Sequence, residues 1–189
     1  MTKAICITGL LILLACNQNK KQSESVDQKS ADTTVTTEKE DMTPDAGLGE
    51  SLAKMAPLTE QEMRDLLPLQ LSGAARASEE VDGSIGTLSA MGEYRLNDST
   101  ELKLTIIDCA GPAGVGVYNM QYLGMLGIHE ENEDEYTRTV DYGNGKAFES
   151  CSKKKTDCSL TWFVGRYLVS LEGNLTVGEL KKLAGGINL

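Results

Sequence analysis

The chain has 189 residues, of which 40% are hydrophobic, and a formal net charge of -10. That length supplies the core of one domain and leaves little room for a second. The acidic balance argues against nucleic acid as a partner, because no cluster of Lys and Arg is present to neutralise phosphates.

The first residues have the pattern of an export signal. Lys3 supplies a positive charge, and residues 4–15 form an apolar run. A membrane-spanning helix needs about 20 apolar residues, so this shorter run favours a signal peptide.

The end of the apolar run, Leu13-Leu14-Ala15-Cys16, resembles the lipobox of bacterial lipoproteins. The resemblance implies that residues 1–15 are removed as a signal peptide and that Cys16 is acylated (palmitate among the expected acyl chains). Several acyl chains would hold the protein stably in the cell envelope. By the same resemblance, Asn17 after the cysteine favours the outer membrane, with the domain facing the periplasm or the cell surface.

Residues 16–57 are dominated by Gln, Lys, Ser, Thr, Asp and Glu. Such a composition cannot bury enough apolar surface to offset the entropy of ordering. We therefore expect a flexible polar tether over 16–57, followed by a single globular domain over 58–189.

Sequence signals for a helix start occur at both the beginning and the end of the predicted domain. Thr59 and Glu62 form a capping box before a short helix, and Thr176 and Glu179 form another before the last helix. A third helix is expected over 111–128, where Val115, Tyr118, Tyr122 and Met125 recur at helical spacing.

Six strands are predicted between these helices. Alternating apolar residues indicate strands over 87–96 and 101–109, and glycine-containing turns join four further strands into a C-terminal meander. The fold class expected is α+β, an antiparallel sheet of about six strands packed against two or three helices. The strands of the meander are expected over 136–142, 146–152, 158–164 and 167–173.

This layout, together with "GRYLVSLEGN" at 165–174 and "ELKKLA" at 179–184, resembles small envelope lipoprotein domains of unknown function. The resemblance implies an architecture and no activity.

Three cysteines remain once the signal and the acylated residue are set aside. Cys151 and Cys158 flank a predicted hairpin, which could bring their Cβ atoms to the distance of a disulfide, and such a pair is oxidised outside the cytoplasm. Cys109 ends an apolar strand and is expected to be a small buried side chain, although its redox state stays open.

We interpret the protein as a non-catalytic envelope lipoprotein that binds a partner protein or supports envelope maintenance. No cofactor, metal ion or catalytic residue is expected. One alternative is a carrier or sensor with a cleft for a small apolar ligand, and another, weaker one is an exported enzyme centred on His129. The side chains that would line the apolar cleft are Tyr118, Met120, Tyr122 and Met125.

Two short segments bear on covalent modification by glycan. "DST" at 98–100 and "DTT" at 32–34 resemble the O-glycosylation sequon of Bacteroidota. The resemblance implies that Ser99 or Thr33 could carry glycan.

The disulfide prediction is tested by counting free thiols. When the natively exported protein is denatured without reduction, a thiol reagent is expected to modify fewer than three cysteines beyond Cys16, because Cys151 and Cys158 are paired. Three reactive thiols in the denatured, unreduced protein would contradict the pairing, and a reduced sample provides the control.

Overall fold

The structure is a computed structural model that describes residues 34–35 and 46–189. The predicted signal peptide, Cys16, Thr33 and most of the predicted tether lie outside the described residues.

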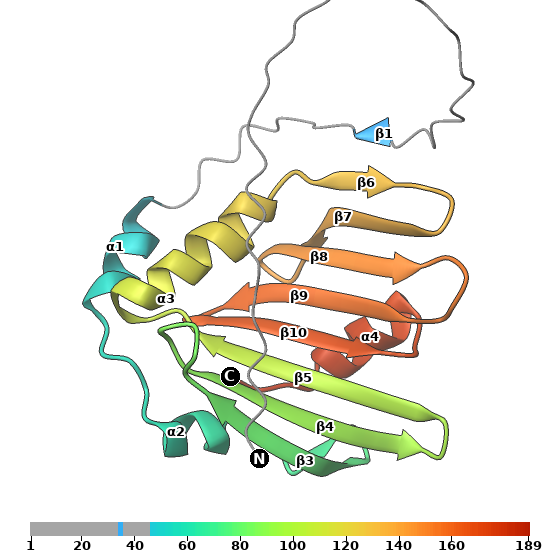
Figure 1. The fold of residues 1–189 in the computed structure, drawn as a ribbon, viewed down its shortest axis with the longest axis horizontal. Helices are drawn as coiled ribbons and strands as arrows, with labels where there is room; N and C mark the ends of the chain where they lie inside the picture. Colours follow the sequence, from blue (N-terminus) through green and yellow to red (C-terminus); the bar gives the residue numbers. More distant parts are fainter. Residues whose placement is uncertain (1–33, 36–45) are drawn as a thin grey trace, which may run out of the picture. The chain divides into compact units, whose positions relative to one another are not determined.

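One antiparallel sheet organises the described part of the chain (Figure 1). Nine strands follow in the order β6-β7-β8-β9-β10-β5-β4-β3-β2, and the two-residue β1 pairs with β6 as a tenth. The strands are β1 (Thr34–Val35), β2 (Gln70–Leu71), β3 (Ala74–Asp82), β4 (Ser89–Asn97), β5 (Thr100–Asp108), β6 (His129–Glu131), β7 (Glu135–Tyr142), β8 (Gly145–Ser152), β9 (Cys158–Val164) and β10 (Tyr167–Gly173).

Helices lie on both faces of this sheet. The four α-helices are α1 (Ala46–Lys54), α2 (Glu60–Asp65), α3 (Gly111–Val117) and α4 (Val177–Ala184). Both predicted capping boxes are present, at the starts of α2 and α4. After α3 the helix continues as a π-helix (Tyr118–Tyr122) and a 3-10 turn (Leu123–Met125), so the segment predicted as one helix changes its hydrogen-bonding pattern twice.

The α+β class and the antiparallel sheet are as predicted, but the expected number of strands and helices is too low. The missing strands β2, β3 and β6 are short or largely exposed. The sequence around β3, "GAARASEEVDGS", has one β-branched apolar residue, so it lacks the alternation that marks a half-buried strand. Helix α1 lies within the range assigned to the tether, yet its Leu52 is fully buried.

Two separate cores result from the two faces of the sheet. On the first face, Leu104 and Val169 pack with Met63 near α2 and Leu180 of α4. On the second face, Phe148 and its neighbours pack under α1 and α3. The buried members of this second core are Leu52, Cys109, Val117, Tyr118, Tyr122, Phe148 and Leu168.

The first face carries the larger core. In contrast, α1 and α3 cover the second face only toward one end of the strands, as Figure 1 shows. The remainder of the second face is therefore without a helix among the described residues.

The outermost strands are short. β2 pairs with only the first two residues of β3, and β3 carries a register shift between Arg76 and Ser78. At the other side, β6 has three residues, all exposed. Among the described helices, none combines the length and the apolar character that crossing a membrane requires.

Glycines of α3 provide a matched pair for testing the second core. A Cβ at Gly114 would lie 2.7 Å from the carbonyl oxygen of Cys109, whereas a Cβ at Gly116 would meet nothing within 4 Å. We expect Gly114→Ala to lower the free energy of unfolding by about 1–3 kcal/mol through overpacking. Gly116→Ala should instead raise it by about 0.5–1 kcal/mol, because alanine favours the helix.

Urea titrations followed by circular dichroism measure both effects. Equal changes in the two variants would contradict the close contact between α3 and Cys109.

Candidate functional site

The tyrosines of the predicted apolar cleft belong to the second core. Tyr118 and Tyr122 are buried, and Val115 and Met125 pack beside them as the helical spacing predicts. The ring of Tyr118 lies 4.8 Å from that of Phe163, centroid to centroid. Of the residues proposed to line the cleft, Tyr118 and Tyr122 are thus packed against protein side chains.

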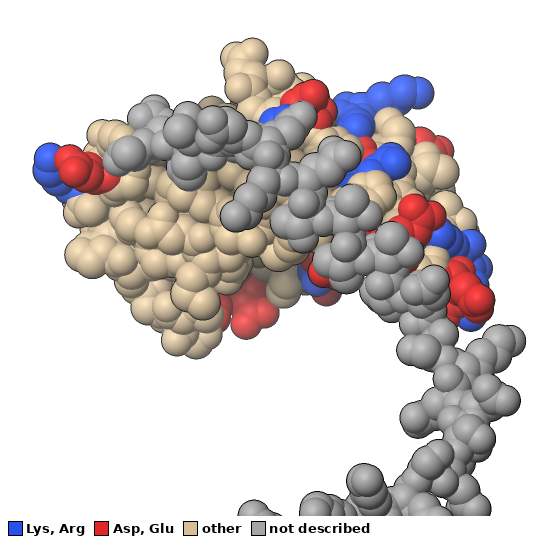
Figure 2. All heavy atoms as spheres, turned by 90° about the horizontal axis from the view of Figure 1, so that it is seen from above, with Lys and Arg blue, Asp and Glu red and all other residues tan. Residues whose placement is uncertain are grey.

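Met120 does not join this group, since 79% of it is exposed. It lies on a segment, residues 109–128, that contains no charged residue. Seen from above, a broad area without charged atoms extends toward the side on which Figure 1 places α1 and α3 (Figure 2).

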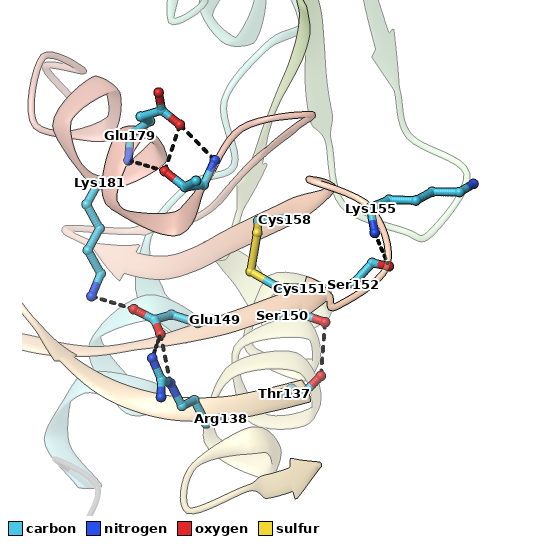
Figure 3. Close-up of a disulfide and its surroundings, with 11 residues drawn as sticks. Thr137, Arg138, Glu149, Ser150, Cys151, Ser152, Lys155, Cys158, Glu179 and Lys181 are labelled. Carbon is cyan, nitrogen blue, oxygen red and sulfur yellow. Dashed lines mark hydrogen bonds and ion pairs between the residues drawn. A yellow bond between two sulfur atoms is a disulfide. The ribbon is translucent and has the colours of Figure 1, made fainter. Parts of the chain in front are cut away.

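Cys151 and Cys158 form a disulfide, in agreement with the prediction. They lie opposite each other on β8 and β9, with their Cα atoms 4.1 Å apart (Figure 3). Cys109 is fully buried in the second core, and burial raises the pKa of its thiol to about 11. Because the thiolate is the nucleophilic form, the raised pKa and the burial both disfavour reaction of this thiol near neutral pH.

His129 is exposed on β6 and faces away from the second core, where Cys109 is buried. In the register of the sheet its partner is Arg138 of β7. The acidic loop that follows contacts the lysines of the β8–β9 loop: Lys153 binds Glu131 at 2.5 Å, and Lys154 pairs with Asp134. Within the part of the chain that the structure describes, no three His, Cys, Asp or Glu side chains gather as a metal site.

Asp108 ends β5 in a fully buried position and accepts hydrogen bonds at both carboxylate oxygens. Arg166, in the β9–β10 turn, donates to Oδ1 at 2.8 Å and to Oδ2 at 2.7 Å. The backbone N–H of Leu58 donates to Oδ2, and Arg166 also donates to the carbonyl of Ala56. This pair therefore fastens the segment between α1 and α2 to the end of the sheet.

The open part of the second face forms a groove with a volume of about 830 Å³. Its lining comes from β3, β4, β5, β10, β9, β8 and β7, so the groove crosses seven adjacent strands. The residues predicted to line an apolar cleft and His129 are not part of this lining, whereas Ser99 and both cysteines of the disulfide are. We call this surface the groove and define it by these strands.

Hydroxyl groups line the groove on β8 and β9. Ser150 and Ser159 are register partners on β8 and β9, and Thr137 donates a hydrogen bond to Ser150 at 3.0 Å (Figure 3). Farther along the same face, the hydroxyls of Thr161 and Ser170 lie 3.0 Å apart. These pairs fix the side chains of neighbouring strands.

The groove carries more acidic than basic side chains. Its basic residues, Arg95 and Lys103, are both in ion pairs with groove carboxylates, Glu101 at 3.1 Å and Glu172 at 2.9 Å. The six acidic residues in the lining are Glu93, Asp98, Glu101, Glu135, Asp157 and Glu172.

Ser99, a predicted glycosylation residue, lies at the rim of the groove. It is exposed in the β4–β5 turn, and its hydroxyl donates to Asn97 at 3.0 Å. Asn174, which follows β10, donates to its backbone carbonyl.

Glu149 lies on the first face, on the other side of β8 from Ser150 (Figure 3). Its side chain is 1% exposed, and it pairs with Arg138 of β7 at 2.8 Å and with Lys181 of α4. Burial raises the pKa of Glu149, but the hydrogen bonds from Lys181 and Arg138 outweigh burial and lower it. The carboxylate therefore joins α4 to the strands that carry the groove.

The two acidic residues of β5 do not form a carboxylate pair of the kind that glycosidases use. Glu101 and Asp108 occupy opposite ends of β5, a separation of about 23 Å at roughly 3.3 Å per residue. They do not flank a common substrate position.

No protein-family model matches the chain, and comparisons with curated proteins and with solved structures found no match either. The case for the groove as a functional site therefore depends on its geometry and its charges.

Replacement of Glu149 tests the junction between α4 and the sheet. Glu149→Gln should lower the free energy of unfolding by about 1–3 kcal/mol at neutral pH, because Arg138 and Lys181 lose their shared anion. The control, Asp141→Asn, affects a pair in which Asp141 is 88% exposed and should cost at most about 0.5 kcal/mol.

The effect also has a predictable pH dependence. Because the pKa of Glu149 is lowered from 4.5, its stabilisation is present above that pH and is lost as the pH falls through the folded-state value. The difference between wild type and Glu149→Gln should shrink in acid, as measured by urea unfolding at several pH values. A difference that does not change with pH would contradict the ion pairs.

Proposed function

We propose that the protein is a non-catalytic, lipid-anchored domain of the bacterial cell envelope that binds a partner protein through the groove. Anchoring would occur at Cys16 after loss of residues 1–15, with the domain on the periplasmic or surface side of the outer membrane. The proposal needs no cofactor, metal ion or nucleic acid.

The groove is the observation that carries the binding role. A volume of about 830 Å³ is open on a sheet face that is otherwise buried under α1 and α3. An uncovered face of this kind is available to a partner without any rearrangement of the core.

Rigidity of the groove supports the same conclusion. The disulfide ties β8 to β9 from the first face, beneath the groove, and the pair of Lys103 and Glu172 links β5 to β10 within it. A preformed surface lowers the entropic cost of association.

Binding in a groove also fits the observed sites better than either alternative. Tyr118 and Tyr122 pack with Phe148 and Phe163, which favours a core role over a ligand cleft. Cys109 is buried away from His129, and this separation gives a nucleophilic mechanism no support.

Photo-crosslinking in the native cell tests the proposal. A photoreactive amino acid at Ala77, which lines the groove, is expected to produce a discrete adduct with a partner protein. The same amino acid at Ala53, exposed on α1 and outside the groove, should not. Adducts of equal yield from both positions, or from neither, would contradict a binding role for the groove.

The anchor is checked in the same cells by fractionation. The wild-type chain should sediment with membranes, and the Cys16→Ser variant, exported with a signal peptide whose cleavage does not need acylation, should appear in the soluble fraction because it cannot be acylated. A variant that still sediments with membranes would contradict the lipid anchor.

A further inference from the structure

We infer that the groove receives an extended peptide segment rich in lysine or arginine, presented by the partner protein. This inference rests on the proposed binding function and names the chemistry of the ligand.

Charge balance is the first argument. The groove lining contains six acidic and two basic residues, and both basic residues are already bound to groove carboxylates. Four acidic residues remain that have no ion pair with any described residue. These are Glu93, Asp98, Glu135 and Asp157.

The first two lysines of the β8–β9 loop do not neutralise these four carboxylates, and Lys155 of the same loop has no ion pair with any described residue. Lys153 and Lys154 of the β8–β9 loop bind Glu131 and Asp134, which lie outside the groove. The negative charge of the groove is therefore available to a cationic ligand, which charge complementarity would also steer toward it.

The spacing of the carboxylates indicates the size of the ligand. Glu93 lies on β4 and Glu135 on β7, five strand steps apart in the sheet. At about 4.8 Å per step this is roughly 24 Å, the length of about seven residues of extended peptide. Between the two ends, β8 and β9 contribute Ser150 and Ser159, whose hydroxyls can bond to backbone amides, and β10 and β5 contribute the ion pair of Glu172 and Lys103.

This arrangement favours a peptide over a small polycation. Unpaired acidic residues at both ends, separated by hydroxyl groups and by the internally neutralised pair of Lys103 and Glu172, suit a ligand that carries separated charges and a polar backbone. A small flexible amine would engage only one end.

Fluorescence anisotropy measures the binding. The probe is a labelled nine-residue peptide of alternating lysine and serine, added to the full chain purified in detergent at low salt. The groove variant combines Glu93→Gln, Asp98→Asn, Glu135→Gln and Asp157→Asn. The control variant makes the same change in net charge outside the groove, at exposed Glu50, Glu60, Glu130 and Glu133, each changed to Gln.

We expect the dissociation constant of the peptide to rise about tenfold in the groove variant, equivalent to about 1.4 kcal/mol, and at most about twofold in the control. A peptide with glutamate in place of lysine should not bind. Because a fourfold variant can fold poorly, the double variant Asp98→Asn with Asp157→Asn, confined to turns, should show about a threefold rise.

Three outcomes would overturn the inference. The wild-type chain could fail to bind the lysine peptide, the two charge variants could weaken binding equally, or spermine could bind as tightly as the peptide. Each would refute the peptide assignment while leaving the Ala77 adduct, and with it the proposed function, intact.

Discussion

The buried pair of Asp108 and Arg166 is the constraint on which the arrangement of the domain depends. A carboxylate with no exposed surface is stable only when its charge and its hydrogen bonds are satisfied, and four donors surround this one. Those donors come from the end of β5, the β9–β10 turn and the segment before α2. The pair thereby positions α1 over the second core. It also determines which end of the second face α1 and α3 cover.

The opposite end of that face remains uncovered as a consequence. Helix α3 follows β5 directly and stays near the end of the sheet where β5 finishes, since Gly114 lets it approach the backbone of Cys109 closely. The chain then returns through β6 to β10 and places its last helix, α4, on the first face, where Glu149 holds Lys181. The groove is thus the part of the second face that no described helix reaches, and its charges come from residues that the strands leave exposed.

Local signals were sufficient to predict the regular part of this fold. Both capping boxes, the strands β4, β5 and β7 to β10, and the pairing of Cys151 with Cys158 follow from short-range patterns. The strands β2, β3 and β6 could not be predicted because their pairing, and not their composition, makes them strands. The groove could not be predicted either, because only the order of the strands brings Glu93 and Glu135 to one face. The tyrosines that were predicted as ligand contacts repeat with the period of a buried helix face, which is the role they have.

The short outer strands have a bearing on how the protein behaves at high local concentration. An unpaired edge offers backbone N–H and C=O groups to any other strand, which is the usual route to aggregation of sheet proteins. Most of β3 is such an edge, but its register shift bends it, and Glu80 and Asp82 place negative charge along it, whereas Glu79 is paired with Arg64 and Arg76. Two copies of the chain would therefore repel each other at this edge. When many copies are crowded on one surface, this repulsion opposes the pairing of β3 strands from different copies into a larger sheet.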